Sequence, residues 1–213
     1  MGDHFNRRLS RLLLKSLGVP RITIDKEIAA FDADAETARA ESTLRDLIAI
    51  YPENRKIEHV LIKVITINKL YHARVLDVDL HPLAVHVAGI ENLDEKLQEG
   101  SPGAVDAIWI SQGTRRRYFS FATKFCSWHR QDAYAIYDMN MWEALRAYRT
   151  EDSRFTFRDA ESKDYAGFYA IVKRFQSSYD LEGYSLKDVD KFLWRVGGQI
   201  LAAKKSTGAP LAL

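Results

Sequence analysis

The length of the apolar segments between chain breakers restricts the fold of this chain more than any other feature. Its 213 residues include only five prolines and eleven glycines, so regular segments can run far before a turn interrupts them. Apolar side chains recur at helical spacing in most of these segments, and the alternation typical of strands is rare. The pattern predicts an all-α fold.

Glycines, prolines and capping residues mark where the individual helices begin and end. We expect helices over residues 3–17, 35–50, 56–70, 81–90, 92–100, 105–110, 138–148, 164–175 and 185–203. The segment 56–70 is rich in β-branched residues, but its length favours a buried helix over a strand. Residues 22–34 remain ambiguous, because Ile22–Ile24 looks like a short extended entry and Asp25 can cap a following turn.

Composition restricts the class of protein. Hydrophobic residues make up 46% of the chain, enough for one domain or for two small lobes that share a core. Cys126 is the single cysteine, so no internal disulfide can form, and we expect a buried structural thiol in a reducing compartment. No apolar run approaches the roughly 20 residues that cross a membrane. We therefore expect a cytoplasmic protein.

Charge is distributed unevenly along the chain, although the net charge is only +2. Between Ser111 and Arg149 there are seven lysines or arginines and three acidic residues, while acidic residues gather at 25–41 and 77–99. Such a division predicts one basic face that binds a polyanion, although ordinary solvated surface explains it equally well.

Lys124 is the first candidate for chemistry, because it lies in an apolar, aromatic segment between Phe121 and Cys126. Burial there disfavours the charged ammonium and leaves a nucleophilic amine that can form a Schiff base. In the alternative, the side chain extends from a core-facing helix to the surface.

Asp138 stands where a new helix should begin. An aspartate at this position accepts hydrogen bonds from the first amides and commonly has only this structural role, worth about 1 kcal/mol. A carboxylate held in this way also stays ionised and oriented, which suits the stabilisation of a developing positive charge. Both roles remain open for Asp138.

The run Arg115–Arg117 stands beside Tyr118 and Phe119, so phosphate-binding and base-stacking groups are adjacent. A solvated helix start explains the same run. The histidines show no metal-ligand spacing, and the proximity of His129 to Cys126 in the sequence does not make a catalytic dyad.

Several short motifs together resemble those of a known enzyme family. Thr123-Lys124, an apolar helix and then Ile136 to Trp142 resemble the catalytic segment of helix-hairpin-helix DNA glycosylases of the 8-oxoguanine type. The chain is more closely similar to bacterial proteins with the 8-oxoguanine glycosylase fold, through Val60–Lys63, Asn68–Tyr71, Ser120–Lys124, Ile136–Asp138 and Leu186–Trp194. The family's hairpin glycines are replaced here by Phe121 and Ala122, so we expect Arg115–Arg117 to supply the phosphate grip.

The resemblance implies a helical glycosylase-like (helix-hairpin-helix) bundle with two small lobes and the site between them. In that arrangement residues 1–213 form a single domain, in which N-terminal helices of residues 1–55 pack on a catalytic core of residues 56–205. It also implies a DNA glycosylase that flips one nucleotide from the stack. Lys124 attacks the anomeric carbon and forms an imine, Asp138 stabilises the oxocarbenium-like sugar, and strand cleavage by β-elimination can follow.

The resemblance further implies residues that contact DNA and the flipped base. The DNA-binding candidates are Arg115, Arg116, Arg117, Arg130 and Arg74, of which Arg74 falls where family members insert a polar wedge into the DNA gap. The base-pocket candidates are Tyr71, Tyr184 and Trp194, although core packing explains Trp194 equally well. Trp128 and Trp142 are assigned to the core.

Two substrates remain open under this resemblance: 8-oxoguanine, and a hypermodified base such as a modified cytosine of phage DNA, removed in antiviral defence. The expected partner is double-stranded DNA that contains the modified base, bound by a monomer without a metal or cofactor. The competing class is a non-catalytic DNA-binding module with the same fold.

Overall fold

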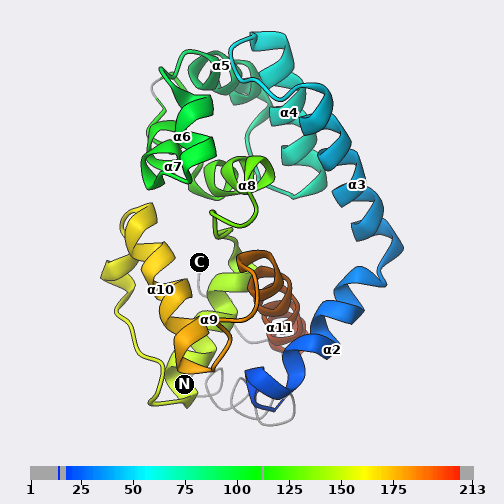
Figure 1. Cartoon of the computed structure of the whole chain (residues 1–213), viewed down its shortest axis with the longest axis vertical. Coiled ribbons are helices and arrows are strands. Elements are labelled where there is room, and N and C mark those ends of the chain that lie inside the picture. The colour runs from blue at the N-terminus through cyan, green and yellow to red at the C-terminus, as the bar shows by residue number, and fades with distance from the viewer. Residues whose placement is uncertain (1–13, 15–17, 112, 207–213) are drawn as a thin grey trace. The chain divides into compact units, whose positions relative to one another are not determined.

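A computed structural model describes residues 14, 18–111 and 113–206 (Figure 1). Within these residues the regular structure is entirely helical, so the all-α prediction is confirmed. The helices are α2 (Pro20–Asp32), α3 (Ala35–Ile50), α4 (Ile57–Leu70), α5 (Asp77–Ala88), α6 (Leu93–Glu99), α7 (Pro102–Trp109), α8 (Phe119–His129), α9 (Met139–Glu151), the 3₁₀ turn η1 (Asp159–Ser162), α10 (Tyr165–Ser178) and α11 (Leu186–Ser206). In this described part no helix combines the length and apolarity that crossing a bilayer requires.

The helices gather into two compact units, each built from separate stretches of chain. The α3–α8 unit contains residues 35–137 and 164–166. The α9–α11 unit contains the described residues up to 34, residues 138–163 and the described residues from 167 onward. Lys124 therefore belongs to the α3–α8 unit, and Asp138 begins the second stretch of the α9–α11 unit.

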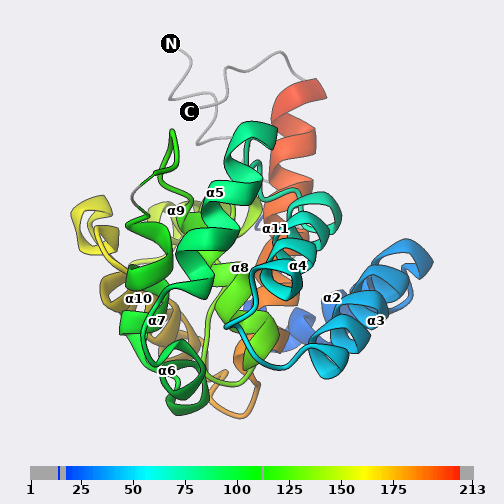
Figure 2. The same ribbon diagram turned by 90° about the horizontal axis from the view of Figure 1, so that it is seen from above.

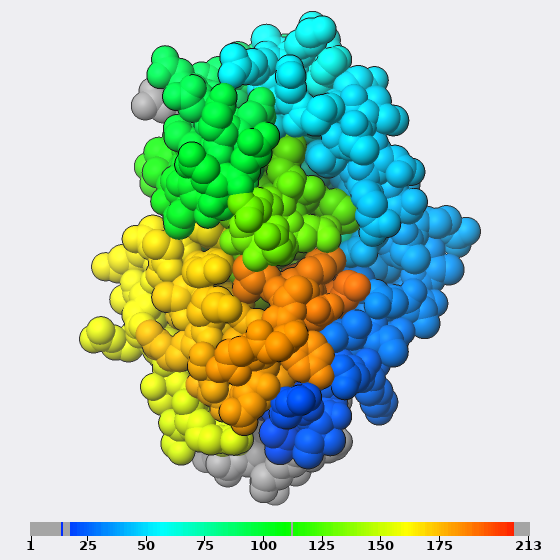
Figure 3. All heavy atoms as spheres, in the orientation of Figure 1, coloured from blue at the N-terminus to red at the C-terminus, as the bar shows by residue number. Residues whose placement is uncertain are grey.

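Helix α8 is the central element of the α3–α8 unit. Helices α3 and α4 pack on one side of it and α6 and α7 on the other (Figures 1 and 2). The space-filling view shows the same order, with the segment that contains α8 between the green atoms of α7 and the cyan atoms of α4 (Figure 3). Residues 121–128 are all buried, which explains why this helix is apolar nearly all round.

Helix α11 organises the α9–α11 unit by packing along both α9 and α2. The α9 contact is unusually close at Gly197, where an added Cβ would lie 1.8 Å from the carbonyl oxygen of Asn140. The α2 contact is partly ionic, because Arg195 Nε donates to the buried carboxylate of Glu27 at 2.8 Å. The start of α9, directly after Asp138, is thus fixed against α11.

The structure differs from the sequence-based expectation in two segments, and the expected helix over residues 3–17 lies outside the described residues apart from Leu14. Ile22–Ile24 is not extended, because α2 begins at Pro20 and continues through Asp25. The fixed backbone φ angle of proline suits the first position of a helix, and this signal at Pro20 was not included in the expectation for residues 22–34. Helix α5 begins at Asp77 rather than at residue 81 and contains Pro82.

Candidate functional site

Lys124 lies in the middle of α8 and is buried, with only 3% of its surface exposed. Its Nζ donates a hydrogen bond of 2.9 Å to the carbonyl oxygen of Tyr71, the residue directly after α4. The alternative in which this side chain extends to the surface therefore does not hold. The lysine instead joins two helices of the α3–α8 unit.

Tyr71 is held from two sides in this unit. Its ring meets Trp128 of α8 edge to face, with centroids 5.4 Å apart, and its hydroxyl donates to Glu41 of α3 at 3.1 Å. Trp128 is buried, as expected. The structure thus brings together two of the predicted site residues, Lys124 and Tyr71, and fixes the Tyr71 backbone that accepts from the lysine.

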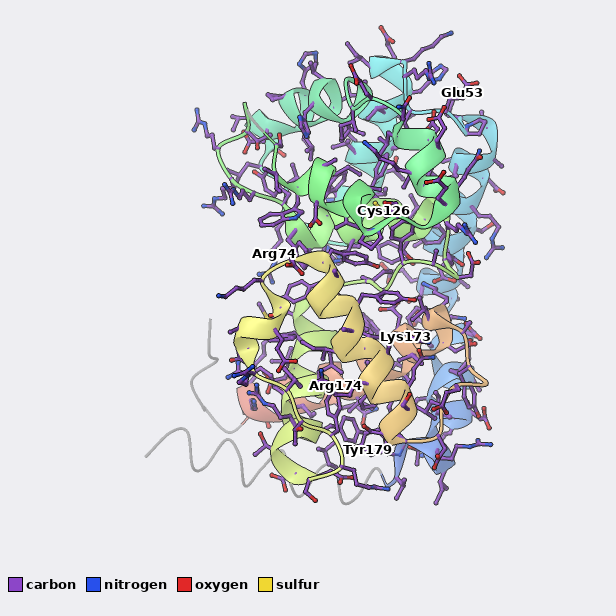
Figure 4. The ribbon with its side chains drawn as sticks, turned by 60° about the vertical axis from the view of Figure 1, so that its left-hand side comes forward. Glu53, Arg74, Cys126, Lys173, Arg174 and Tyr179 are labelled. Atoms are coloured by element: carbon purple, nitrogen blue, oxygen red, sulfur yellow. The ribbon has the colours of Figure 1, made fainter. Side chains whose placement is uncertain are left out.

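The turn after α4 is strained and clamped. Its Asn68 donates from Nδ2 to the Val75 carbonyl at 3.0 Å and accepts from the Val75 amide at 2.8 Å. Within this clamp His72 and Arg74 have φ angles of 46° and 59°, in the left-handed region that costs a residue other than glycine on the order of 1–3 kcal/mol. Arg74 is exposed on this α4–α5 loop (Figure 4). Strain of this kind is often retained where a side chain has a function.

Thr123, the residue before Lys124, is also fixed. Its buried hydroxyl donates to the Ser120 carbonyl and accepts from the Tyr137 amide, both at 3.0 Å. Tyr137 directly precedes Asp138, whose carboxylate accepts from the Met141 amide at 2.8 Å. The predicted capping role of Asp138 is confirmed.

The arginine run Arg115–Arg117 lies in a loop just before α8, and all three side chains are exposed. The buried carboxylate of Asp79 accepts from the Arg115 amide at 3.0 Å and from the Tyr118 hydroxyl. Burial opposes ionisation of Asp79, but the hydrogen bonds from Tyr118 and Arg115 outweigh it and hold its pKa below the ordinary value. Tyr118 itself is buried, so its ring is not among the exposed groups of this loop.

A buried polar network that sequence reasoning did not find surrounds Lys63 of α4. Its Nζ donates to the Glu53 carbonyl at 3.1 Å and to Asn54 Oδ1 at 2.8 Å, and it lies 3.4 Å from His129 Nε2. Glu53 lies on the loop before α4 (Figure 4). Burial lowers the pKa of Lys63 to about 8, although the carboxylate of Asp94 opposes this shift.

His129 completes this network from the end of α8. Its Nδ1 lies 2.8 Å from the Phe125 carbonyl and must donate to it, so Nε2 is the acceptor for Lys63 and for Asn54 Nδ2, which is 3.2 Å away. Burial and the neighbouring Lys63 ammonium lower the pKa of His129 to about 4. Because the participants come from three helices and a loop, no local motif signals this network.

The remaining candidates each have their own surroundings. Tyr184 donates from its hydroxyl to Asp25 Oδ1 at 2.7 Å, and Trp194 is 38% exposed, so complete burial in the core does not describe it. Arg130 is paired with Asp132 at 3.2 Å. Cys126 is buried on α8 (Figure 4), and burial raises the pKa of its thiol well above the ordinary value, as for an inert structural cysteine.

Trp142 is only partly buried, with its ring 5.4 Å from that of Phe157, so the core assignment describes it in part. Across residues 14, 18–111 and 113–206, no three His, Cys, Asp or Glu side chains are grouped so that they can hold a metal ion.

Comparison with known proteins places the chain in a family. No solved structure shows a significant match. A protein of Haemophilus influenzae, described as uncharacterized, is 31% identical over 152 residues, which cover 70% of this chain and 72% of that protein. A family model, HI_0787_N, described as an N-terminal domain, matches residues 23–133, from α2 to the loop after α8. This chain therefore belongs to the HI_0787_N N-terminal domain family, whose model includes Lys124 and ends before Asp138.

Proposed function

We propose that this protein is a DNA glycosylase that flips a modified nucleotide out of the duplex and excises its base. The observation that carries the proposal is the placement of Lys124, a buried amine on an aromatic helix that is anchored to the strained turn bearing Arg74. The reaction class comes from the resemblance of the Thr123-Lys124 and Ile136–Trp142 motifs to helix-hairpin-helix glycosylases.

In the proposed reaction, Lys124 Nζ gives up its hydrogen bond to the Tyr71 carbonyl and attacks the anomeric carbon of the flipped nucleotide. The bond from this carbon to the base breaks as the bond to Nζ forms, and the departing base takes the proton that Nζ releases. Asp138, oriented by the hydrogen bond that its carboxylate accepts from the Met141 amide, stabilises the positive charge on the sugar. Opening of the sugar ring then leaves an imine, from which β-elimination cleaves the strand.

The arginines proposed to contact DNA are ranked by the exposure of their side chains and by whether a carboxylate already pairs with them. Arg115–Arg117 project from a loop whose backbone is fixed on Asp79, so they present charge without a large ordering cost. Arg74 takes the place of the base that leaves the duplex, as a polar wedge. Arg130 has a smaller role, because Asp132 already neutralises it.

Two substrate classes fit the proposal. One is 8-oxoguanine, which needs a flat slot, and the other is a hypermodified base such as a modified cytosine of phage DNA, which needs a roomy polar pocket. Tyr71, Tyr184 and Trp194 are the proposed base-binding aromatics. In either case the enzyme acts as a monomer in the cytoplasm, in repair or in antiviral defence.

A second candidate function is a DNA-binding module without catalysis. The observation that favours it is the hydrogen bond from Lys124 to Tyr71, because a lysine used to join α8 to α4 need not react. The two candidate functions use the same DNA-binding arginines. They differ only in whether Lys124 Nζ reacts with the sugar or serves solely as a hydrogen-bond donor.

Borohydride trapping separates the two candidates. Wild-type protein, Lys124→Gln and the control Lys69→Gln, which alters an exposed lysine of α4, are incubated with an 8-oxoguanine duplex and with phage DNA that contains modified cytosines. The glycosylase proposal predicts a covalent adduct for wild type and for Lys69→Gln but none for Lys124→Gln, and the DNA that gives the adduct identifies the substrate class. An adduct that persists in Lys124→Gln overturns the assignment of the nucleophile. If no adduct forms, an abasic-site assay separates a glycosylase without lyase chemistry from the binding module.

A further inference from the structure

Trp109 packs against Arg117, which lies in the Arg115–Arg117 loop before α8. Its indole is partly exposed at the end of α7, and its Nε1 donates to Asp106 Oδ1 at 2.9 Å, which fixes the plane of the ring. The guanidinium carbon of Arg117 lies 5.4 Å from the centre of the indole. Phe119, the first residue of α8, meets the same indole edge to face, with centroids 5.5 Å apart. A planar cation and a second aromatic ring thus both contact the Trp109 indole.

The loop that carries Arg117 is held in place before any ligand arrives. Asp79 accepts from the Arg115 amide, and the Thr114 hydroxyl donates to the Arg116 carbonyl at 2.8 Å. At the end of the loop, Tyr118 donates to the same Asp79 carboxylate. Because the backbone is fixed on both sides of Arg117, this loop loses little conformational entropy when a ligand binds.

The charge on this loop is available to a polyanion. Other arginines of the chain are paired with carboxylates: Arg130 with Asp132, Arg149 with Asp159 and Arg154 with Asp152. Among the described residues, Arg115, Arg116 and Arg117 form no such side-chain ion pair. Three exposed arginines, of which Arg117 contacts a fixed indole, combine the two features that bind a nucleic acid strand without reading its sequence.

We propose that Trp109, Arg117 and Phe119 form a stacking platform for an unpaired base of a DNA strand, and that Arg115 and Arg116 bind the adjacent phosphates. A base in a duplex presents only its edges, so a stacking surface selects bases that have left the duplex. The inference rests on the proposed function in one respect, because flipping a nucleotide creates such unpaired bases. An acidic peptide would satisfy the arginines but would gain nothing from the indole.

The test compares two single strands of equal length and charge, one of thymidine nucleotides and one of abasic nucleotides, by fluorescence anisotropy. We expect wild type to bind the thymidine strand about tenfold more tightly, because stacking on aromatic side chains has this magnitude. Trp109→Leu and Arg117→Ala should reduce this ratio to about twofold or less, whereas Arg158→Ala, which removes an exposed arginine of the α9–α11 unit, should leave it unchanged.

Several results would overturn the inference. Equal binding of both strands by the wild type is one, and an unchanged ratio in folded Trp109→Leu and Arg117→Ala variants is another. Competition by a polyglutamate peptide as strong as that by the thymidine strand is a third, since it would indicate a general anion site. These results can be distinguished from a failure of the glycosylase proposal. In that case no borohydride adduct forms, but the ratio of binding to the thymidine and abasic strands stays as expected.

Discussion

Lys124 Nζ lies 2.9 Å from the carbonyl oxygen of Tyr71, although the two residues are 53 positions apart in the sequence. The bond ties the middle of α8 to the end of α4, and the same nitrogen is the proposed nucleophile. Its structural and chemical roles therefore compete for one atom, and substitutions can separate them.

Replacement of Lys124 by Met should remove both roles. The apolar stem remains, but the Tyr71 carbonyl loses its partner in a buried place, so we expect the free energy of unfolding to fall by about 1–3 kcal/mol. Urea denaturation measures this loss, with Lys69→Met as the exposed control. Unchanged stability of Lys124→Met would show that the hydrogen bond to Tyr71 contributes nothing, and would weaken the case for a purely structural lysine.

Two substitutions of Asp138 distinguish its role as the N-cap of α9 from its proposed electrostatic role. Asparagine caps a helix about as well as aspartate, so Asp138→Asn should change stability by less than about 0.5 kcal/mol, whereas Asp138→Ala should cost about 1 kcal/mol. In the proposed reaction only the charged group stabilises the sugar cation, so both variants should slow base excision by on the order of 100-fold. Single-turnover excision rates and urea denaturation check the two effects. Wild-type excision by Asp138→Asn would exclude an electrostatic role.

Gly197 and Gly198 are neighbours on α11 with opposite tolerance for a side chain. A Cβ at Gly197 would meet the Asn140 carbonyl oxygen at 1.8 Å, while one at Gly198 would meet only the Asn140 side chain, at 3.3 Å. We expect Gly197→Ala to cost about 1–3 kcal/mol or more, because the backbone of α9 must move. The control Gly198→Ala should be tolerated. Thermal denaturation of both variants checks the difference, and equal melting temperatures would contradict the close α9–α11 contact.

His129 should make the folded protein sensitive to acid. Its pKa is lowered from 6.5 to about 4, so between these values the unfolded chain binds a proton that the folded chain does not. Stability is therefore fully present above pH 6.5 and is lost as pH falls towards 4, by about 3 kcal/mol in all. Urea denaturation between pH 7.5 and 4.5 should show a smaller loss for His129→Gln. Parallel curves for the two proteins would show that His129 is accessible to protons when folded.

Arg74 offers a test of whether backbone strain is kept for function. Glycine adopts a φ near 59° without penalty, so Arg74→Gly should be as stable as wild type or more stable by up to about 1 kcal/mol. The substitution also removes the proposed wedge, so the proposal predicts weaker nucleotide flipping, which 2-aminopurine fluorescence reports. His72→Gly relieves similar strain without removing the wedge and is the control. If Arg74→Gly flips DNA as well as wild type, the wedge assignment is wrong.

Local sequence patterns determined the helices of this chain well. The helices expected to begin at residues 138 and 185 are capped there, since Asp138 accepts from the Met141 amide and Ser185 Oγ accepts from the Asp188 amide at 3.1 Å. Capping and helical periodicity involve residues within one or two turns, so one sequence contains the whole signal. Pro20 shows the limit of local signals, because a proline fits both the position after a helix end and the first position of a new helix, and α2 begins there.

The tertiary structure alone decided which side chains meet. Asp79 accepts from an amide 36 positions away, Lys63 reaches a histidine 66 positions away, and Trp109 lies beside Arg117 on a different element. None of these contacts has a local pattern, because each depends on which faces of separate helices pack together. The sequence by itself therefore determined the all-α class and placed Lys124 on an apolar helix. Packing of α8 against α4 decided that its amine is buried on the Tyr71 carbonyl, because only that packing removes it from water.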